Sequence, residues 1–297
     1  MRKTIIAAAL ALSLAPVAAA AQTAPDQDAD RAADRLDRTI DRALSDRRVG
    51  RDPASFLERK KPTWTIEFST PLAFNSNIGN ESTGAKSSSY VDPTFKLTGK
   101  WELGDLAITA EGGTDTQVFS SNSSYDNATV YGRLALAKKD NKVSGQFLPY
   151  AEYRVLSIYD GIYDQHSITL HQFSAWVRTT FNLGGSDRDK LRLNLAAARR
   201  EASLAAAEQW RYTASATYLN GSGLSISAQF RFADFSGGTN AGRIDKNLQL
   251  GIGYDVELDP ELTLTLGTTF ERNWSNRANR DYTTWDLGPA VSLTRSF

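Results

Sequence analysis

The sequence predicts an all-β fold, an antiparallel up-and-down transmembrane β-barrel of about twelve strands, preceded by a short N-terminal α-helix. Three observations predict it: an export signal at the start of the chain, a hydrophobic alternation with a period of two from Trp64 onward, and connections that alternate between short and long. They divide the chain into a signal peptide (1–21), a charged helical segment in the periplasm or the lumen (22–62) and a barrel (63–297).

The first residues have the three parts of a signal peptide. Arg2 and Lys3 supply the positive charge, residues 5–14 form a short apolar stretch, and small residues follow up to Ala21. The apolar stretch is shorter than the ~20 residues that span a bilayer, which favours a cleaved signal over a membrane anchor. We therefore expect cleavage after Ala20 or Ala21 and export of the protein.

The helical segment differs in composition from the rest of the chain. Residues 26–52 are mostly Asp, Arg and Ala, and Gly50 and Pro53 mark the end of the helix. Small and apolar residues recur at spacings of three and four, at Ala29, Ala33, Leu36, Ile40 and Ala43. The helix at 26–49 could extend into the periplasm, plug the barrel lumen or dock onto a periplasmic partner.

The barrel segments are recognised by their alternation. Phe95, Leu97 and Trp101 lie on one face of such a segment, and Lys96 and Lys100 lie on the other. The twelve segments are 64–68, 95–103, 106–110, 130–136, 147–155, 175–183, 191–197, 210–218, 224–232, 248–256, 262–270 and 285–297. Short connections are expected at 104–105, 139–145, 184–190, 220–223 and 257–261, and long ones at 71–93, 119–128, 157–167, 201–208, 233–245 and 271–282. Tight turns at one end and long loops at the other are typical of a membrane-spanning meander.

Two further features indicate that the apolar face meets lipid. Aromatic residues lie near the ends of segments, as in interfacial girdles, at Trp64, Trp101, Trp210, Tyr218, Tyr254, Phe270, Trp285 and Phe297. The polar face carries large charged side chains, which a dry core could not hold without partners. A hydrated lumen could hold them.

The chain ends on Ser296–Phe297, and this end, with the twelve segments and the signal peptide, resembles Gram-negative outer-membrane β-barrel proteins. The resemblance implies the outer membrane as location, a surrounding lipid bilayer, Phe297 as the membrane-insertion signal and insertion by the barrel-assembly machinery. A helix followed by twelve strands is similar to autotransporter translocator domains, and the size is similar to small oligosaccharide porins. No motif identifies a subfamily.

Alternation assigns the charged residues to the lumen. The middle segments contribute Arg133, Arg154, Arg178, Arg192, Arg200, Arg211 and Arg231, with Glu152 as the acidic exception. The outer segments contribute Glu67, Glu102, Glu111, Asp115, Asp255, Glu257, Glu271 and Asp286, with Lys96 and Lys100 as basic exceptions. Because the first and last strands of a closed barrel are neighbours, we expect an acidic wall opposite an arginine wall.

Composition excludes several function classes. The 34 basic and 34 acidic residues balance, so no bulk charge attracts nucleic acid. The absence of cysteine excludes thiolate metal sites and cysteine nucleophiles, and no phosphate loop, zinc spacing or calcium loop occurs, so we expect no metal and no cofactor. His166 and Ser167 are adjacent and would point to opposite faces of a strand, and the Asn-Gly of outer-membrane phospholipases is missing, so we expect no enzyme.

Three hypotheses about function follow. The first is a small porin-like channel for hydrophilic solutes with a charge-segregated lumen. The second is a non-conducting anchor whose helix plugs the lumen or recruits a partner for export or envelope assembly. The third, an outer-membrane lipid hydrolase, would require His166. The sequence leaves the solute and the oligomeric state open.

Overall fold

A computed structural model describes residues 64–80, 82–139, 143–184 and 188–296. The expected signal peptide, the helix at 26–49 and Phe297 lie outside the described residues. Within the described ranges, no helix is long and apolar enough to cross a membrane.

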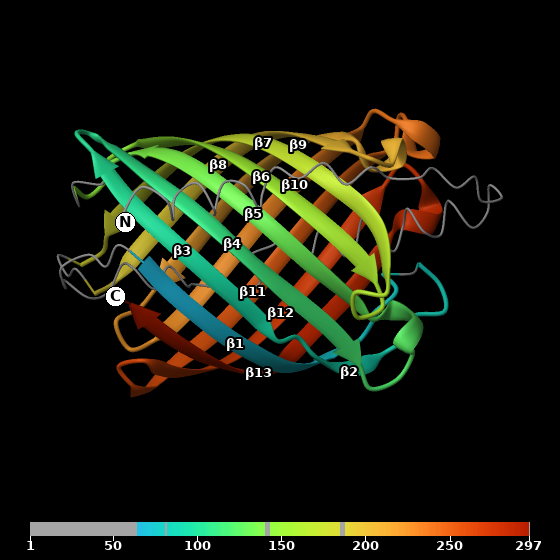
Figure 1. Cartoon of the computed structure of the whole chain (residues 1–297), viewed down its shortest axis with the longest axis horizontal. Coiled ribbons are helices and arrows are strands. Elements are labelled where there is room, and N and C mark those ends of the chain that lie inside the picture. The colour runs from blue at the N-terminus through green and yellow to red at the C-terminus, as the bar shows by residue number, and fades with distance from the viewer. Residues whose placement is uncertain (1–63, 81, 140–142, 185–187, 297) are drawn as a thin grey trace, which may run out of the picture.

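The described chain is a closed, up-and-down antiparallel β-barrel (Figure 1). Its strands are β1 (Trp64–Asn75), β2 (Ser88–Val91), β3 (Thr94–Leu103), β4 (Leu106–Phe119), β5 (Asn127–Lys138), β6 (Leu148–Asp160), β7 (Gln165–Asn182), β8 (Lys190–Ala202), β9 (Gln209–Leu219), β10 (Leu224–Phe235), β11 (Ile244–Asp259), β12 (Leu262–Ser275) and β13 (Tyr282–Ser296). Consecutive strands pair, and β13 pairs with β1, from Thr65 opposite Ser296 to Asn75 opposite Asp286. This pairing closes the sheet, so that no barrel edge remains unpaired there.

The strands β2 and β3 together form one barrel strand. Both pair with β1, β3 along its first half and β2 along its second half, and both pair with β4 on the other side. Asp92 and Pro93 interrupt them, and proline has no N–H to donate to a neighbouring strand. The barrel therefore has twelve strands, and the predicted fold class is confirmed.

Side chains alternate between a polar inner face and an apolar outer face. On β1, Glu67 is 1% exposed whereas its neighbour Phe68 is 46% exposed. Exposed apolar side chains cover the outside of the whole barrel, among them Leu195, Ile226, Ile252, Leu266, Leu287 and Val291. A continuous apolar surface of this kind requires lipid around it, because water would solvate it poorly.

The apolar belt has a visible edge on β11 and β12. Outward residues on β11 are apolar from Val256 to Leu248, and the next outward position is Lys246. On β12 the apolar run ends at Phe270, and Arg272 follows, with its guanidinium 5.7 Å from the ring centre of Trp274. Charge and tryptophan together mark the interface between the lipid tails and the headgroups.

The two barrel ends differ less in connection length than the sequence suggested. One end, where β1 begins and β13 ends, has tight turns at 104–105 and 260–261, but also the connections 139–147 and 183–189. At the other end the expected loop at 157–167 is wrong in extent, because β6 and β7 run on to a turn at 161–164. The strands continue beyond the apolar belt as protruding hairpins, which shortens the loops there.

Loops at this second end, the outer end, are tied to one another. The short 3-10 helices η3 (Ala205–Ala207) and η4 (Gly238–Asn240) pack together, and Asn240 Nδ2 donates a hydrogen bond of 2.9 Å to the Ala206 carbonyl. Arg277, next to η5 (Ala278–Arg280), donates to the Thr239 carbonyl at 2.8 Å. The connections after β8, β10 and β12 therefore form one rim.

Candidate functional site: the inner wall of the barrel

The inner wall near the β13–β1 seam is rich in carboxylates with polar partners. Glu67 on β1 lies 2.7 Å from the ammonium of Lys96 on β3. Asp286 on β13 accepts hydrogen bonds from Asn75 Nδ2 at 2.8 Å and from the Tyr90 hydroxyl at 3.2 Å. The acids on this side are thus held in place by hydrogen bonds rather than spread over an unstructured surface.

Glu271 on β12 is another carboxylate near the seam that accepts several hydrogen bonds. Its Oε1 accepts hydrogen bonds from the Tyr282 hydroxyl at 2.6 Å and from Asn247 Nδ2 at 2.8 Å. The same oxygen lies 4.0 Å from Arg231 Nη2 on β10, so that contact passes over the intervening strand β11.

On the opposite part of the wall, Glu152 lies between two arginines. Its Oε2 is 2.6 Å from Arg133 Nε on β5, and its Oε1 is 3.3 Å from Arg154 Nη2 on the same strand, β6. Arg133 also lies 3.6 Å from Glu111 on β4. The Glu152 side chain is 3% exposed, whereas Arg133 and Arg154 are 22% and 20% exposed. The two arginine side chains therefore still reach solvent inside the barrel.

Further around the wall, the arginines contact amides. Arg178 Nε on β7 donates to Asn194 Oδ1 at 3.1 Å. Arg200 on β8 is 1% exposed and donates to Gln172 Oε1 at 3.5 Å, and Arg211 on β9 donates to Gln209 Oε1 at 3.3 Å. Arg192 shares the inward parity of Arg200 on β8.

Two contacts join a carboxylate to an arginine on a different strand away from Glu152. One is the Arg133–Glu111 pair between β5 and β4, and the other is the Arg231–Glu271 contact between β10 and β12. Asp115 lies on the inward face of β4 with Glu111. Asp255 on β11 accepts a 2.5 Å hydrogen bond from Thr265.

Three of the charged residues assigned to the wall lie near the end with tight turns and are exposed. Glu102 is 40% exposed and pairs with Lys139 at 2.7 Å, at the rim rather than deep inside. Lys100 and Glu257 are exposed as well. These side chains sit where the wall opens to solvent.

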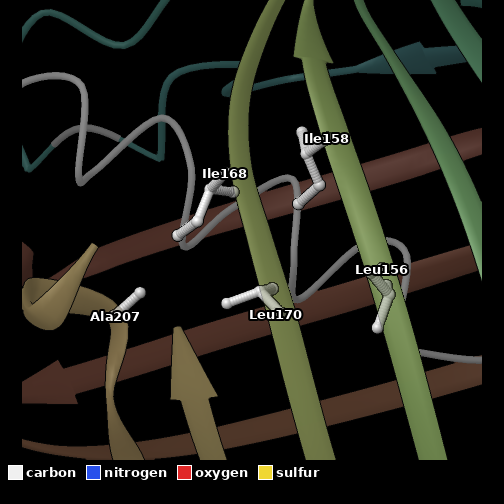
Figure 2. Packing of buried hydrophobic residues seen from close by; sticks show 5 residues of the cluster. All are labelled: Leu156, Ile158, Ile168, Leu170 and Ala207. Atoms are coloured by element: carbon white, nitrogen blue, oxygen red, sulfur yellow. The ribbon is translucent and has the colours of Figure 1, made fainter. Parts of the chain in front are cut away.

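The sequence interpretation missed an apolar patch on the same inner face, near the outer end (Figure 2). Leu156 and Ile158 continue the face of Glu152 and Arg154 on β6, and Ile168 and Leu170 lie beside them on β7. All four are at most 1% exposed, and Ala207 of η3 packs onto them. Their alternation was a usable signal, but they fell in and beside the stretch that was expected to be a loop.

A pair of inward aromatic residues was also missed. Tyr150 on β6 and Trp176 on β7 are register partners on the inner face, and their rings stack with centres 5.5 Å apart. The sequence pattern places Tyr150 in the segment 147–155 and Trp176 in the segment 175–183, but it does not indicate that the two rings meet.

His166 and Ser167 make their hydrogen bonds with other residues. His166 Nε2 lies 3.0 Å from Thr169 Oγ1, and the Ser167 hydroxyl donates to the Gln165 carbonyl at 3.4 Å. A serine activated by this histidine would need the two side chains in hydrogen-bond contact. The described contacts give no support to a hydrolase at this position.

No family model and no curated protein matches the chain. Solved structures match it in fold. An outer-membrane channel from Pseudomonas putida F1 has a TM-score of 0.53 at 9% identity, over 82% of this chain and 100% of that one. The translocator domain of the autotransporter NalP from Neisseria meningitidis has a TM-score of 0.47 at 14% identity, over 91% and 98% of the two chains. A KdgM porin in complex with disordered oligogalacturonate has a TM-score of 0.41 at 13% identity, over 78% and 99%.

At 9% identity, the likeness to the Pseudomonas channel establishes the fold alone, that of an outer-membrane β-barrel. The closed antiparallel barrel and the apolar belt described above place the protein in the outer membrane of a Gram-negative bacterium, with the lipid bilayer around its strands.

Proposed function

We propose that the protein is a channel for small hydrophilic solutes, with a lumen whose charges are segregated into an acidic side and an arginine side. The observation that carries this proposal is the exposure of inward-facing charged side chains, above all Arg133 and Arg154, each about one-fifth exposed within a closed barrel. A sealed interior would bury such groups at a large desolvation penalty. Water in the lumen removes that penalty, and water-filled lumens conduct solutes.

The arrangement of the charges supports a preference among solutes. Arginines on β5 to β9 present planar guanidinium groups that suit carboxylates and phosphates, while the acids line the strands near the seam. A transverse field of this kind orients dipolar solutes and raises the local concentration of anions beside the arginines.

Planar-bilayer recording of the pure, folded protein tests the channel. We expect discrete single-channel steps that persist across preparations. The absence of steps from protein whose folding is verified by heat-modifiable gel mobility would overturn the proposal.

The charge preference is tested by replacing Arg154 and Arg178 together with glutamine. At roughly 10 Å from the axis and 0.1 M salt, each lost charge changes the energy of a monovalent ion by about 0.15 kcal/mol. Two charges act on anions and cations in opposite directions, so the anion-to-cation permeability ratio should fall about threefold. Arg199→Gln is the control, because Arg199 lies on the outer face and pairs with Glu208 at 3.2 Å. An unchanged reversal potential would contradict the lumen assignment.

The alternative of a non-conducting anchor depends on residues 26–52, which lie outside the described part of the chain. Their deletion separates the hypotheses: loss of a co-purifying partner with intact insertion would support an anchor, and a rise in conductance would support a plug. A periplasmic partner and insertion by the barrel-assembly machinery stay predictions.

A further inference from the structure

Tyr150 and Trp176 form an aromatic platform on the inner wall. Both alternate with exposed outward residues such as Ala151 and Ala175, so both rings face the interior of the barrel. Their planes are 8° from parallel, and both side chains are partly exposed. Other inward aromatic residues, such as Tyr90 and Phe119, are fully packed in a buried cluster at the outer end.

An arginine completes the platform. The Arg178 guanidinium lies 5.4 Å from the ring centre of Tyr150, and its Nε donates to Asn194 Oδ1 at 3.1 Å. Asn194 in turn donates to the Ser215 hydroxyl at 3.1 Å. This chain of hydrogen bonds fixes the guanidinium plane next to the rings and leaves little rotamer freedom to lose when a ligand binds.

The side chains beside the platform are small on one side and charged on the other. Trp176 on β7 is the register partner of Ala196 on β8. Ala196 is in turn the register partner of Thr213 on β9. On β6 the next inward residue after Tyr150 is Glu152, which Arg133 and Arg154 already neutralise. The indole is therefore flanked by small side chains, and the phenol ring has a positive charge beside it.

We propose that this platform is a binding site for aromatic carboxylates within the channel. Their ring would extend the stack on the face of the Trp176 indole that Tyr150 leaves uncovered, and their carboxylate would pair with the Arg178 guanidinium. Partly exposed aromatic surface in a hydrated lumen is unfavourable without a ligand, at about 25 cal/mol for each Å² of apolar area. An inorganic anion would use only the arginine and a neutral sugar only the rings, whereas an aromatic acid uses both. The proposal rests on the proposed channel only in that the ligand must enter the lumen.

Binding is measured on the folded full barrel in detergent by isothermal titration calorimetry with three ligands. Benzoate carries both features, cyclohexanecarboxylate keeps the charge without the aromatic ring, and benzyl alcohol keeps the ring without the charge. Aromatic pairs contribute about 0.5–1.5 kcal/mol, so benzoate should bind roughly three- to tenfold more tightly than cyclohexanecarboxylate. Benzyl alcohol should bind more weakly than benzoate by at least as much.

Variants locate the site. Trp176→Leu should weaken benzoate binding about three- to tenfold, and Trp176→Phe, which keeps a ring, should recover most of it. Trp210→Leu is the matched control, because Trp210 faces outward on β9 and should leave benzoate binding unchanged. If Trp176→Leu fails to fold, the three-ligand comparison on the unaltered protein still tests whether the barrel prefers aromatic carboxylates.

Three results would overturn the site: equal affinity for benzoate and cyclohexanecarboxylate, tighter binding of glucuronate than of benzoate, or an unchanged affinity in folded Trp176→Leu. Conductance distinguishes this failure from failure of the channel. Single-channel steps without benzoate binding would refute the site and leave the channel proposal intact. Benzoate binding without single-channel steps would refute the channel and leave the site intact.

Discussion

Glu152 offers a direct test of how the inner wall is held together. It is the one carboxylate predicted within the arginine side, with Oε2 2.6 Å from Arg133 Nε and Oε1 3.3 Å from Arg154 Nη2. The substitution Glu152→Gln keeps the size of the side chain and removes its charge. Two guanidinium groups then lie close together without the anion between them.

The expected loss of stability follows from the geometry. Two unit charges 4 Å apart interact by about 4 kcal/mol at an effective dielectric constant of 20, and breaking one buried pair typically costs about 3–5 kcal/mol. Arg133 keeps Glu111 at 3.6 Å, and both arginines remain about one-fifth exposed, which reduces the loss. We expect Glu152→Gln to lower the free energy of unfolding by about 3 kcal/mol.

The assay is urea unfolding of the barrel in lipid vesicles, followed by tryptophan fluorescence and by gel mobility without heating. The control is Glu102→Gln at the rim, where the carboxylate is 40% exposed and pairs with Lys139. An exposed pair of this kind contributes about 0–1 kcal/mol. Equal stabilities of the two variants would refute the view that Glu152 holds the arginine side together.

Three further predictions test the barrel itself, all by unfolding and gel mobility. Ile252→Arg, at an outward position that is 52% exposed to lipid, should cost about 2–4 kcal/mol, whereas Gln249→Arg on the inner face of the same strand should change stability little. Gly288→Val should cost about 1–3 kcal/mol or prevent closure, because a Cβ there would lie 2.1 Å from the Leu72 carbonyl oxygen at the β13–β1 seam; wild-type stability would contradict this crowding. A chain of residues 63–297 should still fold, because the strand pairs from β1 to β13 close the barrel.

The sorting of residues between the two faces could be predicted from the sequence. Successive side chains of a strand point to opposite faces, so Phe68 and Glu67 separate as soon as the period is recognised. The partners within a face could not be predicted as well. The contact from Arg231 to Glu271 passes over β11, and it depends on the curvature and register of the closed sheet, which no local pattern encodes.

The stretch 157–167 shows why the outer end was misread. Tyr, Asp and Gly residues between Tyr159 and Asp164 are typical of a loop, so the sequence predicts an earlier end of the strand than the structure has. Ile158 and Ile168 nevertheless pair with each other on extended strands and are buried on the inner face. They lie in one cluster with Ala207, which another connection contributes, and a long-range contact of this kind cannot be predicted from local sequence.

The apolar patch also divides the arginines into two groups with different roles. Arg200 lies beside it, since its register partner Gln172 is the next inward residue after Leu170 on β7, and Arg200 is 1% exposed. A guanidinium that solvent does not reach cannot contact a passing ion, so it acts on that ion only through its long-range field, which salt in the lumen screens. Arg154, at 20% exposure, does reach solvent.

Neutralising Arg200 should therefore affect mainly stability, and neutralising Arg154 should affect mainly ion selectivity. Arg200→Gln should lower stability, since it removes a buried charged hydrogen bond to Gln172, and should shift the reversal potential less than Arg154→Gln does. Arg154→Gln should shift the reversal potential toward cation preference and should affect stability less, because its guanidinium is partly hydrated. Reversal potentials in a salt gradient and urea midpoints measured on both variants decide the matter. A larger reversal-potential shift for Arg200→Gln would mean that solutes pass on the side of the apolar patch.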